Sequence, residues 1–131
     1  PLTIAMLDLD HFKSINDNCG HDAGDEVLHE FCHMVREHLR LTDSFGRWGG
    51  EEFIIILPHT NTNDAISSIN RIREDMASMS FKKLHGERKM TFSAGLAIQT
   101  TKDADVNALI KRADAALYLA KNSGRNRLEM G

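Results

Sequence analysis

Residues 44–57 read Ser-Phe-Gly-Arg-Trp-Gly-Gly-Glu-Glu-Phe-Ile-Ile-Ile-Leu, and this stretch decides the fold. Two short segments, 44–48 and 52–57, flank the pair Gly49-Gly50, and Pro58 ends the second segment. Glycine adopts the positive φ angles that tight turns require, so a glycine pair between two such segments is typical of a β-hairpin. The sequence therefore predicts an antiparallel pair of strands at this point.

Acidic residues stand at the ends of two predicted strands. Glu51 and Glu52 follow the glycine pair, and Asp8 and Asp10 close the run Met-Leu-Asp-Leu-Asp at positions 6–10. Carboxylates crowded at strand ends need an opposite charge nearby, and divalent metal ions prefer oxygen ligands of this kind. These residues therefore predict a two-part carboxylate site for a metal ion.

The remaining elements follow from hydrophobic spacing. Apolar or alternating runs predict further strands over residues 2–9, 90–98 and 126–129. Helical spacing predicts helices over residues 11–18, from 22 to about 40, over 63–79 and from about 105 to 123, the second capped by Asp22. We therefore expect an α+β fold with a mostly antiparallel central sheet flanked by helices, close to the ferredoxin-like split βαβ arrangement.

Length and composition exclude several classes of protein. A chain of 131 residues fits one domain, and sixteen Lys and Arg against nineteen Asp and Glu argue against binding a nucleic acid polymer. There is no apolar run of roughly 18–20 residues and no signal peptide, so we expect a cytoplasmic segment without membrane contact, free or part of a membrane-anchored sensor. Cys19 and Cys32 are expected to be reduced thiols.

Several separated motifs resemble one known family. They are Asp-Leu-Asp-His-Phe-Lys-Ser-Ile-Asn-Asp at 8–17, His-Asp-Ala-Gly-Asp at 21–25, Gly-Gly-Glu-Glu-Phe at 49–53, Ala-Leu-Tyr-Leu-Ala-Lys at 116–121 and Ser-Gly-Arg-Asn at 123–126. Together they resemble the GGDEF family of diguanylate cyclases, in its GGEEF form, over nearly the whole chain. The resemblance implies a nucleotidyl-cyclase-type fold, a GGDEF domain over residues 1–131, and condensation of two GTP molecules to cyclic di-GMP with release of pyrophosphate.

The resemblance implies a catalytic role for three of the acidic residues. Asp8 and Glu51 are expected to bind Mg²⁺ or Mn²⁺, with the backbone carbonyl of Leu9 as a further ligand. Joining a 3′-hydroxyl to an α-phosphorus needs a metal that neutralises phosphate charge and helps ionise the attacking oxygen. Glu52 is expected to bind the metal or to accept the hydroxyl proton.

The resemblance also implies how the nucleotide is held. Asn16 and Asp25 are expected to read the guanine edge, which presents N–H donors beside an acceptor oxygen. Glycines in the hairpin turn would let the nucleotide lie across it, and cations would meet the terminal phosphates. The further substrate-binding residues are Lys13, His21, Gly49, Gly50, Lys121 and Arg125.

A second site is implied by Arg40-Leu41-Thr42-Asp43, which lies just before the hairpin. It resembles the family's RxxD inhibitory site, where cyclic di-GMP binds, and Arg71 corresponds to a further arginine of that site. Arginine stacks on purines and pairs with phosphate and base edges, so feedback inhibition by the product is expected. An ordinary surface ion pair between Arg40 and Asp43 is the alternative.

Two other functions compete with the cyclase. His29-Glu30-Phe31-Cys32-His33 matches the zinc peptidase motif H-E-x-x-H, with Glu52 as a third ligand. That third glutamate belongs on a helix, however, and Glu52 opens a predicted strand, so His29 and His33 are interpreted as solvent-facing helix residues. The other alternative is a module that binds nucleotide or cyclic di-GMP without turnover.

The expected chemistry also bears on assembly and on residues outside the site. Two half-sites, each with one GTP, must face each other, so a homodimer is expected for catalysis. The family pattern includes a leading helix before the first strand, so we expect this chain to lack that helix and any upstream sensor domain. Asp10 and Asp17 are interpreted as capping or turn residues and are not assigned to the site.

Overall fold

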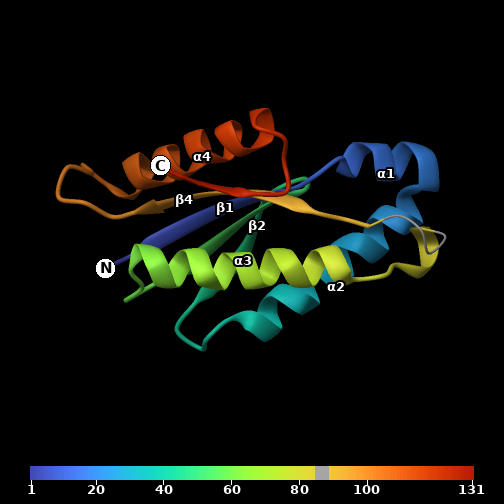
Figure 1. Cartoon of the computed structure of the whole chain (residues 1–131), viewed down its shortest axis with the longest axis horizontal. Coiled ribbons are helices and arrows are strands. Elements are labelled where there is room, and N and C mark those ends of the chain that lie inside the picture. The colour runs from blue at the N-terminus through green and yellow to red at the C-terminus, as the bar shows by residue number, and fades with distance from the viewer. Residues whose placement is uncertain (85–88) are drawn as a thin grey trace.

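A five-stranded sheet forms the middle of the computed structural model, which describes residues 1–84 and 89–131 (Figure 1). Its strands are β1 (Thr3–Leu9), β2 (Ser44–Gly49), β3 (Glu52–Leu57), β4 (Phe92–Ile98) and β5 (Leu128–Met130), in the spatial order β2-β3-β1-β4-β5. β5 pairs parallel with β4, and every other neighbouring pair is antiparallel. The predicted α+β fold with a mostly antiparallel sheet is confirmed.

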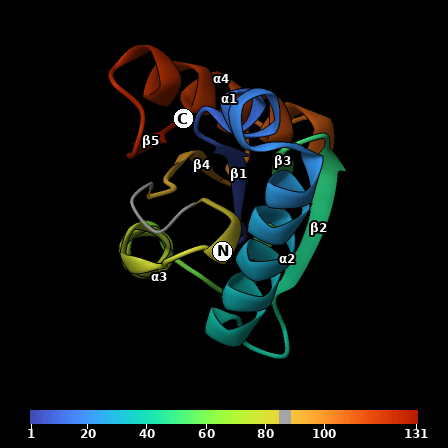
Figure 2. The same cartoon turned by 90° about the vertical axis from the view of Figure 1, so that its right-hand side faces the viewer.

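Helices cover both faces of this sheet. They are α1 (Phe12–Cys19), α2 (His21–His38), α3 (Thr62–Ser78) and α4 (Val106–Asn122), with a 3₁₀ turn at Lys82–Leu84. α4 packs on one face, against β1 and β4, whereas α2 and α3 lie on the other face (Figures 1 and 2). None of the helices within residues 1–84 and 89–131 is long and apolar enough to span a bilayer.

The alternation of β1 divides the core into two layers, because successive residues of a strand face opposite sides of the sheet. Leu7 and Leu9 belong to the larger cluster, which α2 and α3 cover. Ile4 and Met6 belong to the smaller cluster, which α4 covers. Asp8 continues this second set, so the alternation puts its carboxylate on the α4 side, at the end of the central strand.

α4 approaches the sheet most closely at Gly95 of β4. A Cβ at this position would stand 2.1 Å from both the carbonyl oxygen of Ala113 and the nitrogen of Leu117, which are backbone atoms of α4. No side chain fits between helix and strand here, so direct backbone packing fixes the position of α4 on the sheet.

The first strand of the hairpin extends one residue further than predicted, to Gly49, and the second begins at Glu52 as predicted. Gly49 pairs with Glu52 across β2 and β3, so the turn consists of Gly50, at φ 45°, and Glu51. Arg47 braces the turn by donating a hydrogen bond from Nε to the carbonyl of Gly50 at 2.6 Å. Glu51 therefore belongs to the turn itself and not to the strand that follows.

Positive φ angles explain two other differences from the predicted boundaries. α2 begins at His21 with Gly20, at φ 89°, as its cap, and Asp22 lies within the first turn, where an acidic residue still favours the helix dipole. The closing strand begins at Leu128 and not at residue 126. The reason is that Arg125 and Asn126 have φ angles of 63° and 46°, which a strand does not allow.

Candidate active site

Two carboxylates face each other across the central strands. Asp8 on β1 is the direct partner of Glu52 on β3 in the antiparallel register, and directly opposite residues point to the same face of a sheet. Asp8 is only 6% exposed. Like charges in this arrangement repel each other, so the site needs a cation.

α4 supplies that cation from its last turn. Lys121 donates a hydrogen bond from Nζ to Oδ2 of Asp8 and forms an ion pair with it. Burial raises the pKa of Asp8 above its usual range, and the Lys121 ammonium opposes this rise, whereas the charges of Glu51 and Asp10 add to it. Burial also raises the pKa of Glu52, and the charge of Asp8 raises it further.

A cavity of about 200 Å³ lies at this end of the sheet. Its lining residues are Asp8, Leu9, Asp10, His11, Phe12, Lys13, Glu51, Lys121 and Arg125. The structure thus brings together the two carboxylates predicted to bind metal and the three cations predicted to meet phosphate. Groups of both signs around one small cavity suit a polyphosphate that binds together with a metal ion.

The donor groups fit a divalent metal that is shared with a nucleotide. Asp8 and Glu51 offer carboxylates, and the N–H of Leu9 donates to the carbonyl of Glu51 at 3.2 Å, which joins the turn to the end of β1. Within the described residues, no group of three or more His, Cys, Asp or Glu is arranged to hold a metal ion. Mg²⁺ commonly takes one or two protein carboxylates and completes its shell with water and phosphate oxygens.

The predicted base-reading residues lie where α1 packs on α2. Lys13 lines the cavity, and Asn16 follows it by one turn on the same side of α1. Gly24 of α2 makes room for Asn16, because a Cβ on Gly24 would stand 1.9 Å from Asn16 Oδ1. Asp25 follows Gly24 and is exposed, as is His21 at the start of the same helix.

The hairpin turn is open on its outer side. Gly49 and Gly50 are exposed, and a Cβ added at either position would meet no neighbouring heavy atom within 4 Å. The turn therefore leaves space for a ligand next to Glu51.

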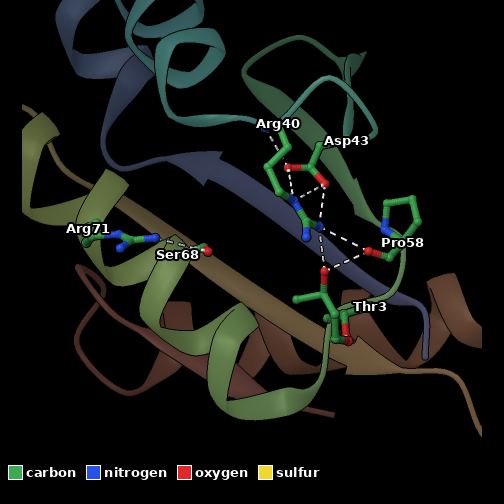
Figure 3. A network of polar contacts seen from close by, with 7 residues as sticks. Thr3, Arg40, Asp43, Pro58, Ser68 and Arg71 are labelled. Atoms are coloured by element: carbon green, nitrogen blue, oxygen red, sulfur yellow. Dashed lines mark hydrogen bonds and ion pairs between the residues drawn. The ribbon is translucent and has the colours of Figure 1, made fainter.

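Arg40 and Asp43 form more than a surface ion pair (Figure 3). The Arg40 guanidinium donates to both carboxylate oxygens of Asp43, to the carbonyl of Pro58 at 3.0 Å and to Oγ1 of Thr60 at 2.6 Å. The Asp43 side chain is only 3% exposed, and Thr60 accepts a further hydrogen bond from Thr3 through its carbonyl. This network ties the connection before β2 to the connection after β3.

The same pair lines a second cavity, of about 430 Å³, between α3 and the end of α2. Arg71 on α3 also lines it, and the Nη2 atom of Arg71 lies 3.5 Å from Oγ of Ser68 (Figure 3). The structure therefore brings the three predicted inhibitory-site residues, Arg40, Asp43 and Arg71, to one cavity that is separate from the cavity at Asp8.

The arrangement expected of a zinc peptidase is not found in the described residues. His29 and His33 are exposed on α2, as predicted, and His33 pairs with Glu37 one turn later. Glu52 opens strand β3, and no metal-binding group of three side chains includes these residues.

Asp10 makes contacts that the sequence interpretation, a capping or turn role, did not predict. It is 5% exposed and accepts three hydrogen bonds, from the hydroxyls of Thr91 and Ser93, both at 2.7 Å, and from the N–H of Asn126 at 3.0 Å. It does not cap α1, whose first turn follows His11. The alternation of Asp8 and Asp10 on one side of the strand was the available signal.

The chain matches the family model described as "Diguanylate cyclase, GGDEF domain" over residues 1–127. The response regulator PleD of Caulobacter vibrioides is 41% identical over 128 residues, which cover 96% of this chain and 28% of that protein. The diguanylate cyclase DgcP of Pseudomonas aeruginosa is 42% identical over 129 residues, or 98% of this chain and 19% of that protein. The chain thus spans less than a third of the length of these relatives.

Solved structures agree with the sequence comparisons. The active GGEEF domain of a diguanylate cyclase from Vibrio cholerae superposes with a TM-score of 0.92 at 36% identity, covering 98% of this chain and 81% of that one. The GGDEF domain of DgcB from Caulobacter crescentus, solved in complex with c-di-GMP, gives a TM-score of 0.92 at 32% identity and covers 98% and 77% of the two chains.

The crowding of carboxylates predicts a pH-dependent cost in stability. The raised pKa of Glu52 means that the folded chain holds this proton more tightly than the unfolded chain, so stability falls as pH rises through the folded pKa. We expect Glu52→Gln to raise the melting temperature by about 1–3 °C at neutral pH, with no gain below about pH 4. Thermal melts across pH, with the exposed Glu74→Gln as control, measure this. A gain that does not change with pH would contradict the assignment.

Proposed function

The chain belongs to the family of diguanylate cyclase GGDEF domains, and from this premise we propose that it condenses two molecules of GTP to cyclic di-GMP with release of pyrophosphate. The observation that carries the proposal is the cavity at the end of β1, where Asp8 and Glu51 meet Lys13, Lys121 and Arg125. This combination of acidic and basic groups suits a triphosphate bound with a divalent metal.

In this proposal the acidic residues hold the metal and the basic residues hold the phosphates. Asp8, Glu51 and the Leu9 carbonyl bind Mg²⁺ or Mn²⁺, which, when bound, neutralises phosphate charge and lowers the pKa of the attacking 3′-hydroxyl. Lys121 is paired with Asp8 and also lines the cavity, so it can offset both the carboxylate and the phosphate. Lys13 and Arg125 are exposed and approach the same cavity from α1 and from the turn after α4.

Glu52 takes the role of proton acceptor or additional metal ligand. It lies opposite Asp8, and its pKa is raised, so it holds a proton more readily than an ordinary surface glutamate. A base with a raised pKa is better matched to taking a proton from a hydroxyl near neutral pH. Both 3′-hydroxyls must reach the α-phosphate of the other nucleotide, so the proposal includes a homodimer in which two such sites face each other.

Glu51 provides the most direct test of the proposed metal site. It lies in an open turn, so Glu51→Ala should fold with a melting temperature within about 2 °C of the unchanged chain. Pyrophosphate release from GTP with Mg²⁺ should fall by at least about a hundredfold, because a ligand is lost. Turnover unaffected by Glu51→Ala would reject the metal assignment. Tight GTP binding without any turnover in the unchanged chain would favour the non-catalytic binding module.

The proposed base recognition predicts a change in nucleotide preference. Asp25 can accept hydrogen bonds from the two N–H donors of guanine, which adenine does not present in that pattern. Asp25→Ala should therefore reduce the preference for GTP over ATP by about tenfold or more, measured as a ratio of dissociation constants. Gly24→Ala should act in the same direction, because its Cβ displaces the Asn16 amide. A preference that survives both changes would contradict this assignment.

We also propose that the cavity between α3 and the end of α2 binds the product and inhibits the reaction. Arg40, Asp43 and Arg71 line it, and arginine can stack on guanine and pair with phosphate. The crystal structure of the related DgcB domain contains c-di-GMP, which supports a product-binding role for this family. Arg40 is held by Asp43, Pro58 and Thr60, whereas Arg71 is exposed on α3.

Because Arg40 is held by hydrogen bonds and Arg71 is exposed, alanine substitutions of the two residues should differ in their effect on stability. Arg71→Ala should raise the concentration of cyclic di-GMP needed for half inhibition by about tenfold and leave the melting temperature unchanged. Arg40→Ala should do the same but also lower the melting temperature, because it leaves the nearly buried Asp43 carboxylate without its partner. Inhibition curves and thermal melts of both variants test this. Undiminished inhibition of Arg71→Ala would place the inhibitory site elsewhere.

A further inference from the structure

Asp10 connects the end of β1 to the segment that carries Arg125. Its Oδ2 accepts the N–H of Asn126, and its two oxygens are oriented by Thr91 and Ser93 at the start of β4. Arg125 precedes the residue that Asp10 holds, and both Asp10 and Arg125 line the cavity at the proposed phosphate end. By holding the backbone of Asn126, Asp10 can therefore influence the conformation of Arg125, the preceding residue.

The segment that Asp10 holds is strained. Gly124, Arg125 and Asn126 have consecutive positive φ angles of 115°, 63° and 46°. Glycine tolerates such angles and asparagine adopts them more readily than most residues, but arginine does so only at a cost in free energy. A strained turn persists only when its surroundings impose it, so the contacts around it decide where Arg125 points.

Other contacts hold the same turn from its remaining sides. Arg73 on α3 donates to the side-chain and backbone oxygens of Asn126 at 3.0 and 3.3 Å. The N–H of Arg125 donates to the carbonyl of Ala120 at 3.0 Å, and the carbonyl of Arg125 accepts a hydrogen bond from Arg127 at 3.3 Å. The Arg125 guanidinium has no hydrogen bond or ion pair within the described residues, so its backbone is fixed while its charged group is available.

We propose that Asp10 is a positioning residue for phosphate binding: its carboxylate holds the left-handed turn at Arg125 and Asn126 and so directs the Arg125 guanidinium toward the terminal phosphates of GTP. The proposal rests on the proposed function, because it requires that Arg125 binds phosphate. Asp10 itself does not touch the nucleotide in this account. Its whole effect on GTP is exerted through Arg125.

A double-mutant cycle tests this dependence without requiring turnover. Asp10→Ala, Arg125→Ala and the double variant are titrated calorimetrically, with Mg²⁺, against a GTP analogue whose α and β phosphorus atoms are joined by a methylene group. GMP, which lacks the terminal phosphates, is titrated in parallel. Asp10→Asn, which keeps an acceptor for the Asn126 N–H, is the conservative variant, and the exposed Asp17→Ala is the control for loss of a carboxylate.

We expect Asp10→Ala to weaken binding of the analogue by about tenfold, to leave GMP binding unchanged, and to have no further effect once Arg125 is alanine. Asp10→Asn should retain most of the affinity, and Asp17→Ala all of it. An equal loss for the analogue and GMP, or an Asp10→Ala effect that persists in the Arg125→Ala background, overturns the positioning role.

A second cycle covers the case in which Asp10→Ala does not fold. Ser93→Ala removes a hydroxyl that orients the carboxylate and leaves Asp10 in place. If Ser93→Ala weakens binding of the analogue and this loss disappears in the Arg125→Ala background, the proposal is supported. If Ser93→Ala has no effect, or the same effect in both backgrounds, the proposal is overturned. If Arg125→Ala alone leaves analogue binding unchanged, Arg125 does not bind phosphate, and the positioning role of Asp10 fails as well. If the effect of the Asp10 change is the same with and without Arg125, only the positioning role of Asp10 fails.

Discussion

The ion pair between Lys121 and Asp8 is the interaction on which the candidate active site depends. It joins the end of the central strand to the last turn of α4, two elements that are far apart in the sequence. Without it, a buried Asp8 carboxylate would face Glu52 across the sheet without a cation bonded to it, an arrangement that opposes folding. Several carboxylates thus lie close together at one end of the sheet, and Lys121 of α4 offsets part of their charge. This is the kind of local conflict that functional sites retain.

Much of the fold could be predicted from the sequence because its elements have clear periodicities. The apolar run of β1, the alternation of β4 and the stripe along α4 each indicated the correct element. The errors fell where backbone conformation decides the outcome: Gly20 caps α2 in place of Asp22, and positive φ angles at Arg125 and Asn126 delay β5. Such angles depend on contacts from distant elements, which a local pattern does not contain.

The candidate site shows the same division. The resemblance to the GGDEF family indicated Asp8, Glu51 and Lys121, and the structure brings them to one cavity. The hydrogen bonds of Asp10 could not be predicted, because its partners come from segments that only the sheet topology brings together. These partners are Thr91, Ser93 and Asn126. Arg40 and Asp43 were predicted as a ligand-binding pair with an ion pair as the alternative, yet they form a structural network and also line a cavity. The side chains that we propose to bind the product thus also stabilise the connections on either side of the hairpin.

The close approach at Gly95 fixes the distance between α4 and β4. The backbones of the two elements are in direct contact there, so no side chains lie between them that could repack and let the helix shift along the strand. Lys121 lies in the last turn of that helix, eight residues after Ala113 and four after Leu117, which is about two turns and about one turn. Its position therefore depends on how α4 is held against the sheet. Gly95 has no side chain and does not line the cavity at Asp8, yet it helps to set the position from which Lys121 reaches Asp8.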